Sequence, residues 1–242
     1  MRYKLTLSFD GSAFCGWQMQ KNAPSVQGEI TRCARELFGD TATVTGASRT
    51  DSKVHALGFV CHVDTSKELS ESSVVSAFNH LLDPHIAVLS CEEVDDTFHA
   101  RYSAVSKEYH YVIHNSSVPD PFLKDRAWFY PKKLDDKKMN ECARGLVGEH
   151  DFFSFMAAGS KITDCVRTIY SAEVVRNGDL VVLKIAGNGF LYNMVRIIAG
   201  TLVDIDAGRI NKSIDDIILS RSRECAGVTA PAHALYLYRV NY

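Results

Sequence analysis

The chain of 242 residues has no apolar run that approaches the roughly 20 residues of a membrane-spanning helix. Its seven cysteines are scattered singly and form no C-x-x-C pair, which argues against a disulfide framework and a cysteine-based zinc site. Low-complexity tracts, long charge blocks and short-period repeats are also missing. Together with an N-terminus that does not read as a signal peptide, these absences predict a soluble globular protein of a reducing cytosol.

The amino-acid composition is that of an ordinary globular protein. Hydrophobic residues make up 46% of the chain and charged residues 23%, and the formal net charge is -2. Such proportions are typical of folded domains. The slight acidity alone argues weakly against a polyanionic partner, because phosphate binding needs concentrated Lys and Arg, although an average can hide a basic patch.

The first half of the chain alternates strand and helix patterns. Apolar residues at every second position predict a strand over residues 3–9. Ser25 is a suitable N-cap for a helix with one apolar face, and Gly39 is placed to end it. The further elements expected in this half are a strand over 57–63, a helix over 70–82 and a strand over 86–94.

The second half repeats this order. A strand is expected over 109–113 and a helix near 139–146, and Asn177-Gly178 between two apolar runs predicts a tight hairpin. Helices near 190–206 and 211–221 and a strand over 236–240 follow. Because both halves can be written as split β-α-β units, we expect an α+β fold. Its two related ferredoxin-like halves, residues 1–105 and 106–242, would have mixed, largely antiparallel sheets forming a central sheet, with helices on one side.

The most unusual segment is the polar, doubly basic stretch from Gly46 to Ala56, which contains Ser48-Arg49-Thr50-Asp51 just before an apolar strand. Loops on rigid scaffolds often carry sites. An Arg two residues from an Asp favours the ionised carboxylate that a nucleophile or base requires. Taken alone, however, the segment is more typical of an Asp or Thr turn with a solvated charge pair.

Five further segments accompany this loop in a fixed order. With it they resemble the TruA family of tRNA pseudouridine synthases from about residue 3 to the C-terminus. The segments are Phe14-Cys15-Gly16-Trp17-Gln18, Val26-Gln27-Gly28, Arg101-Tyr102-Ser103-Ala104 with Lys107-Glu108-Tyr109-His110-Tyr111, Gly148-Glu149-His150-Asp151-Phe152 and Gly189-Phe190-Leu191-Tyr192-Asn193-Met194-Val195-Arg196.

The central motif of that family reads Gly-Arg-Thr-Asp-Ala-Gly-Val-His-Ala, and the resemblance makes Asp51 the catalytic carboxylate. Ser48 stands where Gly is usual, and Ser52-Lys53 replaces Ala-Gly. If the second glycine position needs a positive φ, Lys53 carries a steric cost of about 1 kcal/mol or more. The chemistry of Asp51 is therefore expected in a loop of altered geometry.

The resemblance also implies roles for other residues. Tyr109 is expected to stack on the target base, and Arg49 and Arg196 to orient the carboxylate of Asp51; both are sensible physically, since stacking is worth about 1 to 3 kcal/mol and a guanidinium can hold a carboxylate bidentately. Phe14 and Trp17 could assist base recognition, although packing is the more usual role of such residues. Basic residues near the motifs could bind RNA phosphates: Lys53, Arg101, Lys107 and Arg167.

The function implied by the resemblance is isomerisation of uridine to pseudouridine in the anticodon stem-loop of tRNA. The reaction needs no cofactor and no metal, and the family acts as a cytoplasmic homodimer on tRNA. Two alternatives stay open on sequence grounds. One is a non-catalytic RNA-binding protein of the same fold; the other is a hydrolase that pairs Asp51 with Glu149 or Asp151.

Overall fold

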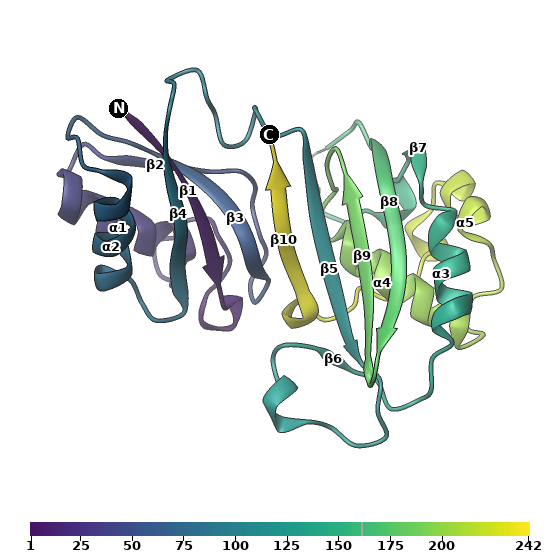
Figure 1. Ribbon diagram of the computed structural model, residues 1–242. Coiled ribbons are helices and arrows are strands. Elements are labelled where there is room, and N and C mark those ends of the chain that lie inside the picture. Colours follow the sequence, from purple (N-terminus) through teal and green to yellow (C-terminus); the bar gives the residue numbers. More distant parts are fainter. Residues whose placement is uncertain (161) are drawn as a thin grey trace. The chain divides into compact units, whose positions relative to one another are not determined.

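The structure is a computed structural model that describes residues 1–160 and 162–242. The chain forms two compact units: Met1–Val105 together with Tyr236–Tyr242, and Ser106–Leu235. Each unit combines a sheet with helices (Figure 1), as expected for an α+β fold. Within the described residues, no helix is both long and apolar enough to cross a membrane.

The first unit contains a sheet in the order β4-β1-β3-β10, with β2 paired to β3. All pairs are antiparallel except β10 with β3. The strands β4-β1-β3-β2 with two helices form the expected split β-α-β arrangement. Its elements are β1 (Arg2–Phe9), η1 (Gly11–Ala13), α1 (Val26–Phe38), β2 (Thr43–Gly46), β3 (His55–Asp64), α2 (Glu71–Leu81), β4 (Ile86–Val94) and β10 (Leu235–Asn241).

One of these strands was missed by the sequence analysis, and the partner of another could not be predicted from it. β2 was not predicted, because four residues at a sheet edge are too few to show a clear period. β10 was expected as a strand, and it comes last in the chain. It pairs with β3, where Tyr236 lies opposite His55, so the strand lies beside the first unit's β3 in Figure 1.

An aromatic core joins both helices of the first unit to the same face of β1. The ring of Tyr3 on β1 stacks on Phe38 of α1 with centroids 5.7 Å apart, and Phe38 contacts Phe78 of α2 at 6.4 Å. All three side chains are almost fully buried. Side chains of Ser25 and Ser70 cap the two helices, as the sequence predicted for the first.

The second unit contains an antiparallel sheet in the order β5-β9-β8-β7, and the short β6 runs parallel to the end of β5. The hairpin expected at Asn177-Gly178 joins β8 to β9. The strands β6 and β7 were too short to be predicted. Its elements are β5 (Ser106–His114), η2 (Pro121–Leu123), β6 (Trp128–Phe129), α3 (Asp136–Arg144), β7 (Gly148–Asp151), η3 (Phe153–Phe155), β8 (Val166–Asn177), β9 (Leu180–Gly187), α4 (Met194–Asp206), α5 (Ile214–Ser220), η4 (Arg223–Cys225) and η5 (Ala232–Ala234).

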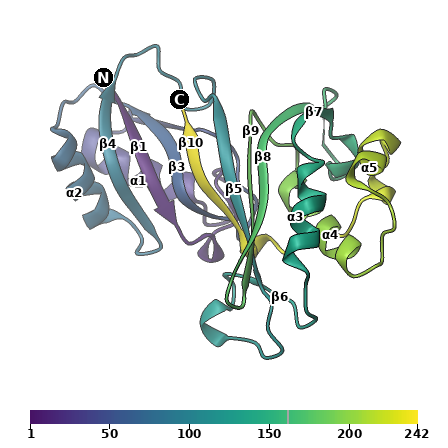
Figure 2. The ribbon, with the colours of Figure 1, turned by 45° about the vertical axis from the view of Figure 1, so that its right-hand side comes forward.

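Helix α4 is the core helix of the second unit. Nearly every residue of α4 is buried, as expected for a helix that is apolar on all sides. In Figure 2, α3, α4 and α5 lie on the same side of the β5-β9-β8 sheet. Helix α4 begins at Met194 rather than near residue 190, because Asn193 adopts a left-handed conformation with φ 59°. The few polar side chains of α4 therefore lie among buried apolar residues.

Candidate active site

The Asp51 loop, residues 47–54, joins β2 to β3 in the first unit. Thr50 is buried, Asp51 is half-buried, and Arg49 and Lys53 are exposed. The main-chain N–H of Val54 donates to the carbonyl of Asp51 at 3.1 Å and closes a tight turn. The structure thus presents two of the predicted site residues, Asp51 and Lys53, on one turn that begins at Asp51, and Arg49 lies just before it.

A second segment, residues 10–17, holds this loop through main-chain hydrogen bonds. The N–H of Trp17 donates to the carbonyl of Thr50 at 3.2 Å, and the N–H of Lys53 donates to the carbonyl of Phe14 at 3.3 Å. The hydroxyl of Ser52 donates to the same Phe14 carbonyl at 3.4 Å. Bonds on both sides of Asp51 fix its main chain.

Two glycines allow the segments to approach this closely. A Cβ on Gly11 would lie 2.0 Å from the carbonyl oxygen of Val54, and a Cβ on Gly16 would lie 2.4 Å from that of Thr50. Gly16 also has φ 94°, which side-chain-bearing residues rarely adopt. The glycine of the first quoted motif is therefore required by the geometry of the Asp51 loop.

The aromatic residues of the same motif are packing anchors. Trp17 is 2% exposed and stacks on Phe59 with centroids 4.1 Å apart, while Phe14 is 5% exposed. Gln27 of the next motif receives a hydrogen bond from the N–H of Met19 at 3.0 Å and donates to the carbonyl of Val44 at 3.1 Å. Burial of both aromatics favours packing over the base-recognition alternative.

The Asp51 loop stores backbone strain and unsatisfied polar groups. Lys53 has φ 68°, so the strain expected where the family has glycine is present. Among the described residues, the buried hydroxyl oxygens of Ser48 and Thr50 have no hydrogen-bond partner. An orphaned buried hydroxyl costs about 1 to 3 kcal/mol. Strain and unsatisfied groups of this kind concentrate at functional sites.

His55, the first residue of β3, supports the loop from its other end. Its Nδ1 accepts the N–H of Gly11 at 3.1 Å and lies 3.2 Å from a carboxylate oxygen of Asp10. Its ring stacks on Tyr236 with centroids 4.7 Å apart. The sequence comparison included His55 in the central motif without a role, and the contact with Gly11 now supplies one.

Tyr109 lies on β5 of the second unit. Its side chain is 8% exposed and meets the ring of Phe190 edge-to-face, with centroids 5.1 Å apart. Both residues come from motifs that the sequence comparison singled out, more than 80 positions apart in the chain. Burial fixes the ring of Tyr109 in one orientation.

Arg196 is half-buried on α4 between buried apolar neighbours. Its Nε donates to the carbonyl of Ala230 at 2.8 Å, and one terminal nitrogen donates to Oδ1 of Asn193 at 2.6 Å. Asn193 is the left-handed residue that precedes the helix. Sequence reasoning found Arg196 but missed both residues that hold it; a polar Asn next to the apolar start of α4 was the available signal.

The other predicted basic residues lie apart along the chain. Arg101 is exposed in the first unit, with its guanidinium 5.5 Å from the ring centre of Tyr102. Lys107 and Arg167 are half-buried on β5 and β8 of the second unit. A guanidinium nitrogen of Arg167 donates to the carbonyl of Asp164 at 3.2 Å. Lys53 and Arg101 thus belong to the first unit, and Lys107 and Arg167 to the second.

The carboxylates of the competing hydrolase interpretation have structural partners. Asp151 accepts the N–H of Phe153 at 3.0 Å and forms an ion pair with Arg221 at 3.1 Å. Glu149 accepts the hydroxyl of Thr168 at 3.5 Å. The contacts of Asp151 stabilise the turn after β7, and that of Glu149 joins β7 to β8, so both residues are explained without a catalytic role.

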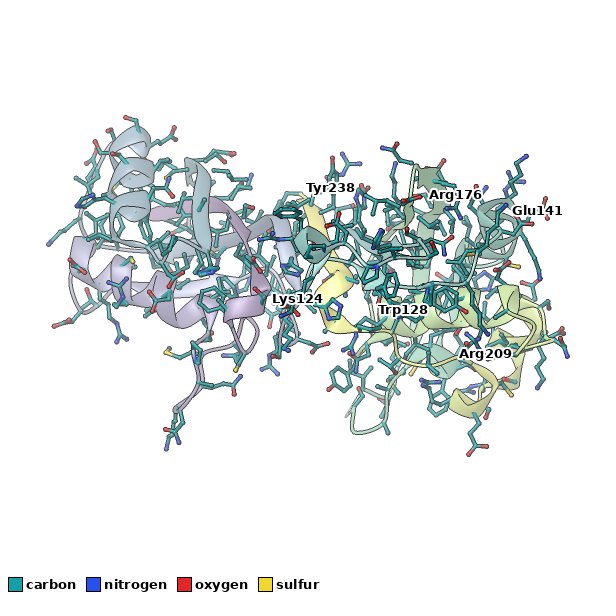
Figure 3. All side chains as sticks on the ribbon, turned by 90° about the horizontal axis from the view of Figure 1, so that it is seen from below. Lys124, Trp128, Glu141, Arg176, Arg209 and Tyr238 are labelled. Atoms are coloured by element: carbon teal, nitrogen blue, oxygen red, sulfur yellow. The ribbon has the colours of Figure 1, made fainter. Side chains whose placement is uncertain are left out.

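A pocket of about 480 Å³ lies under the loop before β6 in the second unit. Lys124 and Trp128, both labelled in Figure 3, line it together with His114 and His233. None of the residues predicted from sequence lines this pocket. The residues considered for the reaction are therefore those of the Asp51 loop, Tyr109 and Arg196, and not the lining of this pocket.

Comparisons with known proteins identify what this set of residues belongs to. A family model described as tRNA pseudouridine synthase matches residues 6–103 and 142–242. This chain belongs to the tRNA pseudouridine synthase family. Proteins named tRNA pseudouridine synthase A are similar over nearly their whole length. One from Bacillus licheniformis is 44% identical, covering 100% of this chain and 99% of the relative; one from Acetivibrio thermocellus is 44% identical, covering 99% and 98%; one from Bacillus subtilis is 43% identical, covering 100% and 99%.

Membership in the tRNA pseudouridine synthase family confirms the resemblance drawn from the motifs. The protein is an isomerase that converts uridine to pseudouridine in tRNA. The reaction breaks the bond from N1 to C1′, turns the uracil over and joins C1′ to C5. Neither water nor an electron is consumed, so isomerisation replaces the hydrolase interpretation.

Proposed function

We propose that Asp51 is the essential carboxylate of this tRNA pseudouridine synthase and that its target uridines lie in the anticodon stem-loop. The observation that carries the proposal is the construction of the Asp51 loop. Main-chain bonds from residues 10–17 hold the loop on both sides of Asp51, and the loop retains a strained Lys53 and a buried, unpaired Thr50 hydroxyl. A turn without a function would readily lose features that destabilise it in this way.

Other residues receive roles from the family resemblance. Tyr109 stacks on the uracil, and Arg49 and Arg196 orient the carboxylate of Asp51. A ring that is already immobilised by Phe190 loses little entropy when a base stacks on it. A guanidinium that Asn193 and a carbonyl already hold is likewise preorganised.

Substrate binding follows from the same assignment. The uridine leaves its stack at a cost of a few kcal/mol, which stacking on Tyr109 and phosphate contacts offset. Lys53, Arg101, Lys107 and Arg167 make the phosphate contacts. Because the net charge is -2, we also propose a homodimer in which each tRNA contacts basic residues of both copies. The seven free cysteines support a place in the reducing cytoplasm.

Mapping of pseudouridine in a transcribed, unmodified tRNA tests this proposal. Purified protein should place pseudouridine in the anticodon stem-loop, and Asp51→Asn should form none while binding the tRNA within about threefold of the wild-type Kd. The Asn side chain keeps the shape of Asp and removes only the charge. Product at other positions alone would overturn the stem-loop assignment, and turnover by Asp51→Asn would overturn the role of Asp51.

A further inference from the structure

The residues that hold Arg196 continue into a second layer built around one peptide segment, residues 226–230, called here the 226–230 segment. The bond from Arg196 to this segment is reciprocal. The side-chain Nε of Arg196 donates to the carbonyl of Ala230 at 2.8 Å, while the N–H of Ala230 donates to the carbonyl of Arg196 at 3.2 Å. The position of the guanidinium therefore depends on where Ala230 lies.

Two side chains of α4 fix the other end of the 226–230 segment. The hydroxyl oxygen of Thr201 accepts the N–H of Gly227 at 2.8 Å, and a carboxylate oxygen of Asp204 accepts the N–H of Val228 at 3.1 Å. Thr201 is fully buried and Asp204 is 6% exposed. Consecutive N–H groups of the segment are thus bound by consecutive turns of one helix.

The contact between α4 and the segment leaves no free space. A Cβ on Gly200 would lie 1.9 Å from the carbonyl oxygen of Val228, and one on Gly227 would lie 2.6 Å from the carboxylate of Asp204. Beyond Ala230, the hydroxyl of Tyr111 on β5 donates to the carbonyl of Pro231 at 2.9 Å. The segment is held along its full length.

Asp204 is a buried acidic residue next to the segment. Its second carboxylate oxygen binds Arg209, labelled in Figure 3, through two nitrogens at 2.6 and 2.7 Å, and Arg209 in turn contacts the hydroxyl of Tyr130 at 3.4 Å. The Arg209 side chain is 49% exposed, and an ion pair with a solvent-exposed partner adds only about 0 to 1 kcal/mol. The presence of a carboxylate at this position needs another explanation, and its hydrogen bond from the N–H of Val228 provides one.

We propose that Asp204 is a positioning residue for the reaction, which holds the 226–230 segment in place so that the carbonyl of Ala230 fixes the guanidinium of Arg196. The inference rests on the proposed role of Arg196. Asp204 touches neither Arg196 nor substrate in this scheme. Its effect on the reaction passes through the main chain from Val228 to Ala230.

The first test is a split between kcat and KM. Asp204→Ala should lower kcat about 10- to 100-fold, the cost of a misplacement near 1 Å, with the KM for tRNA within about twofold. Thr201→Val, which removes the acceptor of Gly227 but keeps the side-chain shape, should lower kcat severalfold and serves if Asp204→Ala folds poorly. Asn140→Ala is the matched control, because Asn140 also accepts one buried main-chain N–H in this unit, that of Val174 at 2.9 Å; its kcat should stay near wild type.

A double-mutant cycle separates positioning from general damage. In an Arg196→Lys background, which has no Nε in the same place, Asp204→Ala should lower kcat no further. Equal factors in both backgrounds would overturn the inference, as would a kcat for Asp204→Ala no lower than that of Asn140→Ala. If Arg196→Lys is slow and Asp204→Ala is normal, the inference alone fails. If Arg196→Lys keeps wild-type kcat, the proposed role of Arg196 fails and the inference with it.

A direct readout needs no activity. The Nε–H of Arg196 should exchange with solvent about tenfold or more faster in Asp204→Ala than in the wild type, measured by nuclear magnetic resonance, because its acceptor moves. The Nε–H of Arg176, which donates to Asp136 at 2.6 Å in the same unit, is the internal control and should keep its rate. Unchanged exchange at Arg196, or equal acceleration at both sites, would overturn the inference.

Discussion

The Asp51 loop and the surroundings of Arg196 are proposed to serve the same reaction but are built in opposite ways. The loop keeps two buried hydroxyls without partners and a Lys in a left-handed conformation. Around Arg196, the polar groups of Thr201 and Asp204 all have partners. The loop that carries the proposed reacting carboxylate is strained and has unsatisfied hydroxyls, whereas the polar groups of Thr201 and Asp204, proposed to position Arg196, have partners.

The left-handed residues of the two regions show the same contrast. Lys53 has φ 68° and Asn193 has φ 59°. Asn is several-fold enriched in this conformation and here also accepts a hydrogen bond from Arg196, whereas Lys is disfavoured there. One position uses a residue suited to its backbone, and the other carries strain. Stability and activity should therefore respond differently to changes in the two regions.

The largest effect should come from adding a methyl group to a glycine that makes a close contact with a carbonyl oxygen. Each region contains one such glycine. Gly11→Ala and Gly200→Ala each bring a Cβ to about 2 Å from a carbonyl oxygen, so each should lower the free energy of unfolding by about 3 kcal/mol or more in chemical denaturation. Gly189→Ala, whose nearest contacts lie at 3.5 Å, should change it by less than about 1 kcal/mol. A small loss of unfolding free energy in either variant would show that its region can relax around the added methyl group. Tight packing would then no longer be a feature of both regions.

Asn193 is the next most sensitive position. Asn193→Ala should lower the free energy of unfolding by about 2 kcal/mol, because Ala pays for the left-handed backbone and removes the acceptor of Arg196. Asn193→Gly keeps the backbone and loses only the acceptor, so about 1 kcal/mol is expected. Equal losses for both variants would mean that the backbone conformation contributes nothing.

Two threonines sharpen the comparison through effects of opposite sign. Thr50→Val removes an orphaned hydroxyl and should raise the free energy of unfolding by about 1 kcal/mol. Thr201→Val removes a hydroxyl with two partners, the carbonyl of Ile197 and the N–H of Gly227, and should lower it by about 1 to 2 kcal/mol. Thermal unfolding of both variants measures this, and the same sign for both would contradict the contrast.

Lys53 should give the smallest effect. Lys53→Gly relieves the left-handed strain and should raise the free energy of unfolding by about 1 kcal/mol, with part of the gain offset by the entropy of glycine in the unfolded chain. Lys53→Ala keeps the strain and is the control. A gain from both variants would point to removal of the charge as the cause.

Sequence reasoning could predict features that depend on local pattern or on ordered motifs. Apolar periodicity, such as the alternation around Tyr3, predicted the helices and the long strands, and Asn177-Gly178 predicted the hairpin. The order of the motifs led to the family. Short edge strands such as β2, with four residues, carry too little periodicity. Of the partners of Arg196, Ala230 was also out of reach, because it contributes only main-chain groups, which almost any residue type has.

The parallel partner of the last strand was out of reach for a similar reason. β10 has an ordinary alternating pattern, which predicts a strand but not its neighbour. Its pairing with β3 is parallel and joins positions about 180 residues apart, such as Tyr236 and His55. Strand pairing of this range depends on the tertiary structure and leaves no local signal.

Single-turnover kinetics of two carboxylate variants test the central claim most directly. With transcribed tRNA carrying tritium at C5 of uridine, Asp51→Asn should release no tritium above background. Asp151→Asn, which removes the ion pair with Arg221 but keeps an acceptor for the N–H of Phe153, should release it within about threefold of the wild-type rate. Both variants should bind tRNA. Tritium release by Asp51→Asn at a rate comparable to wild type would contradict the account.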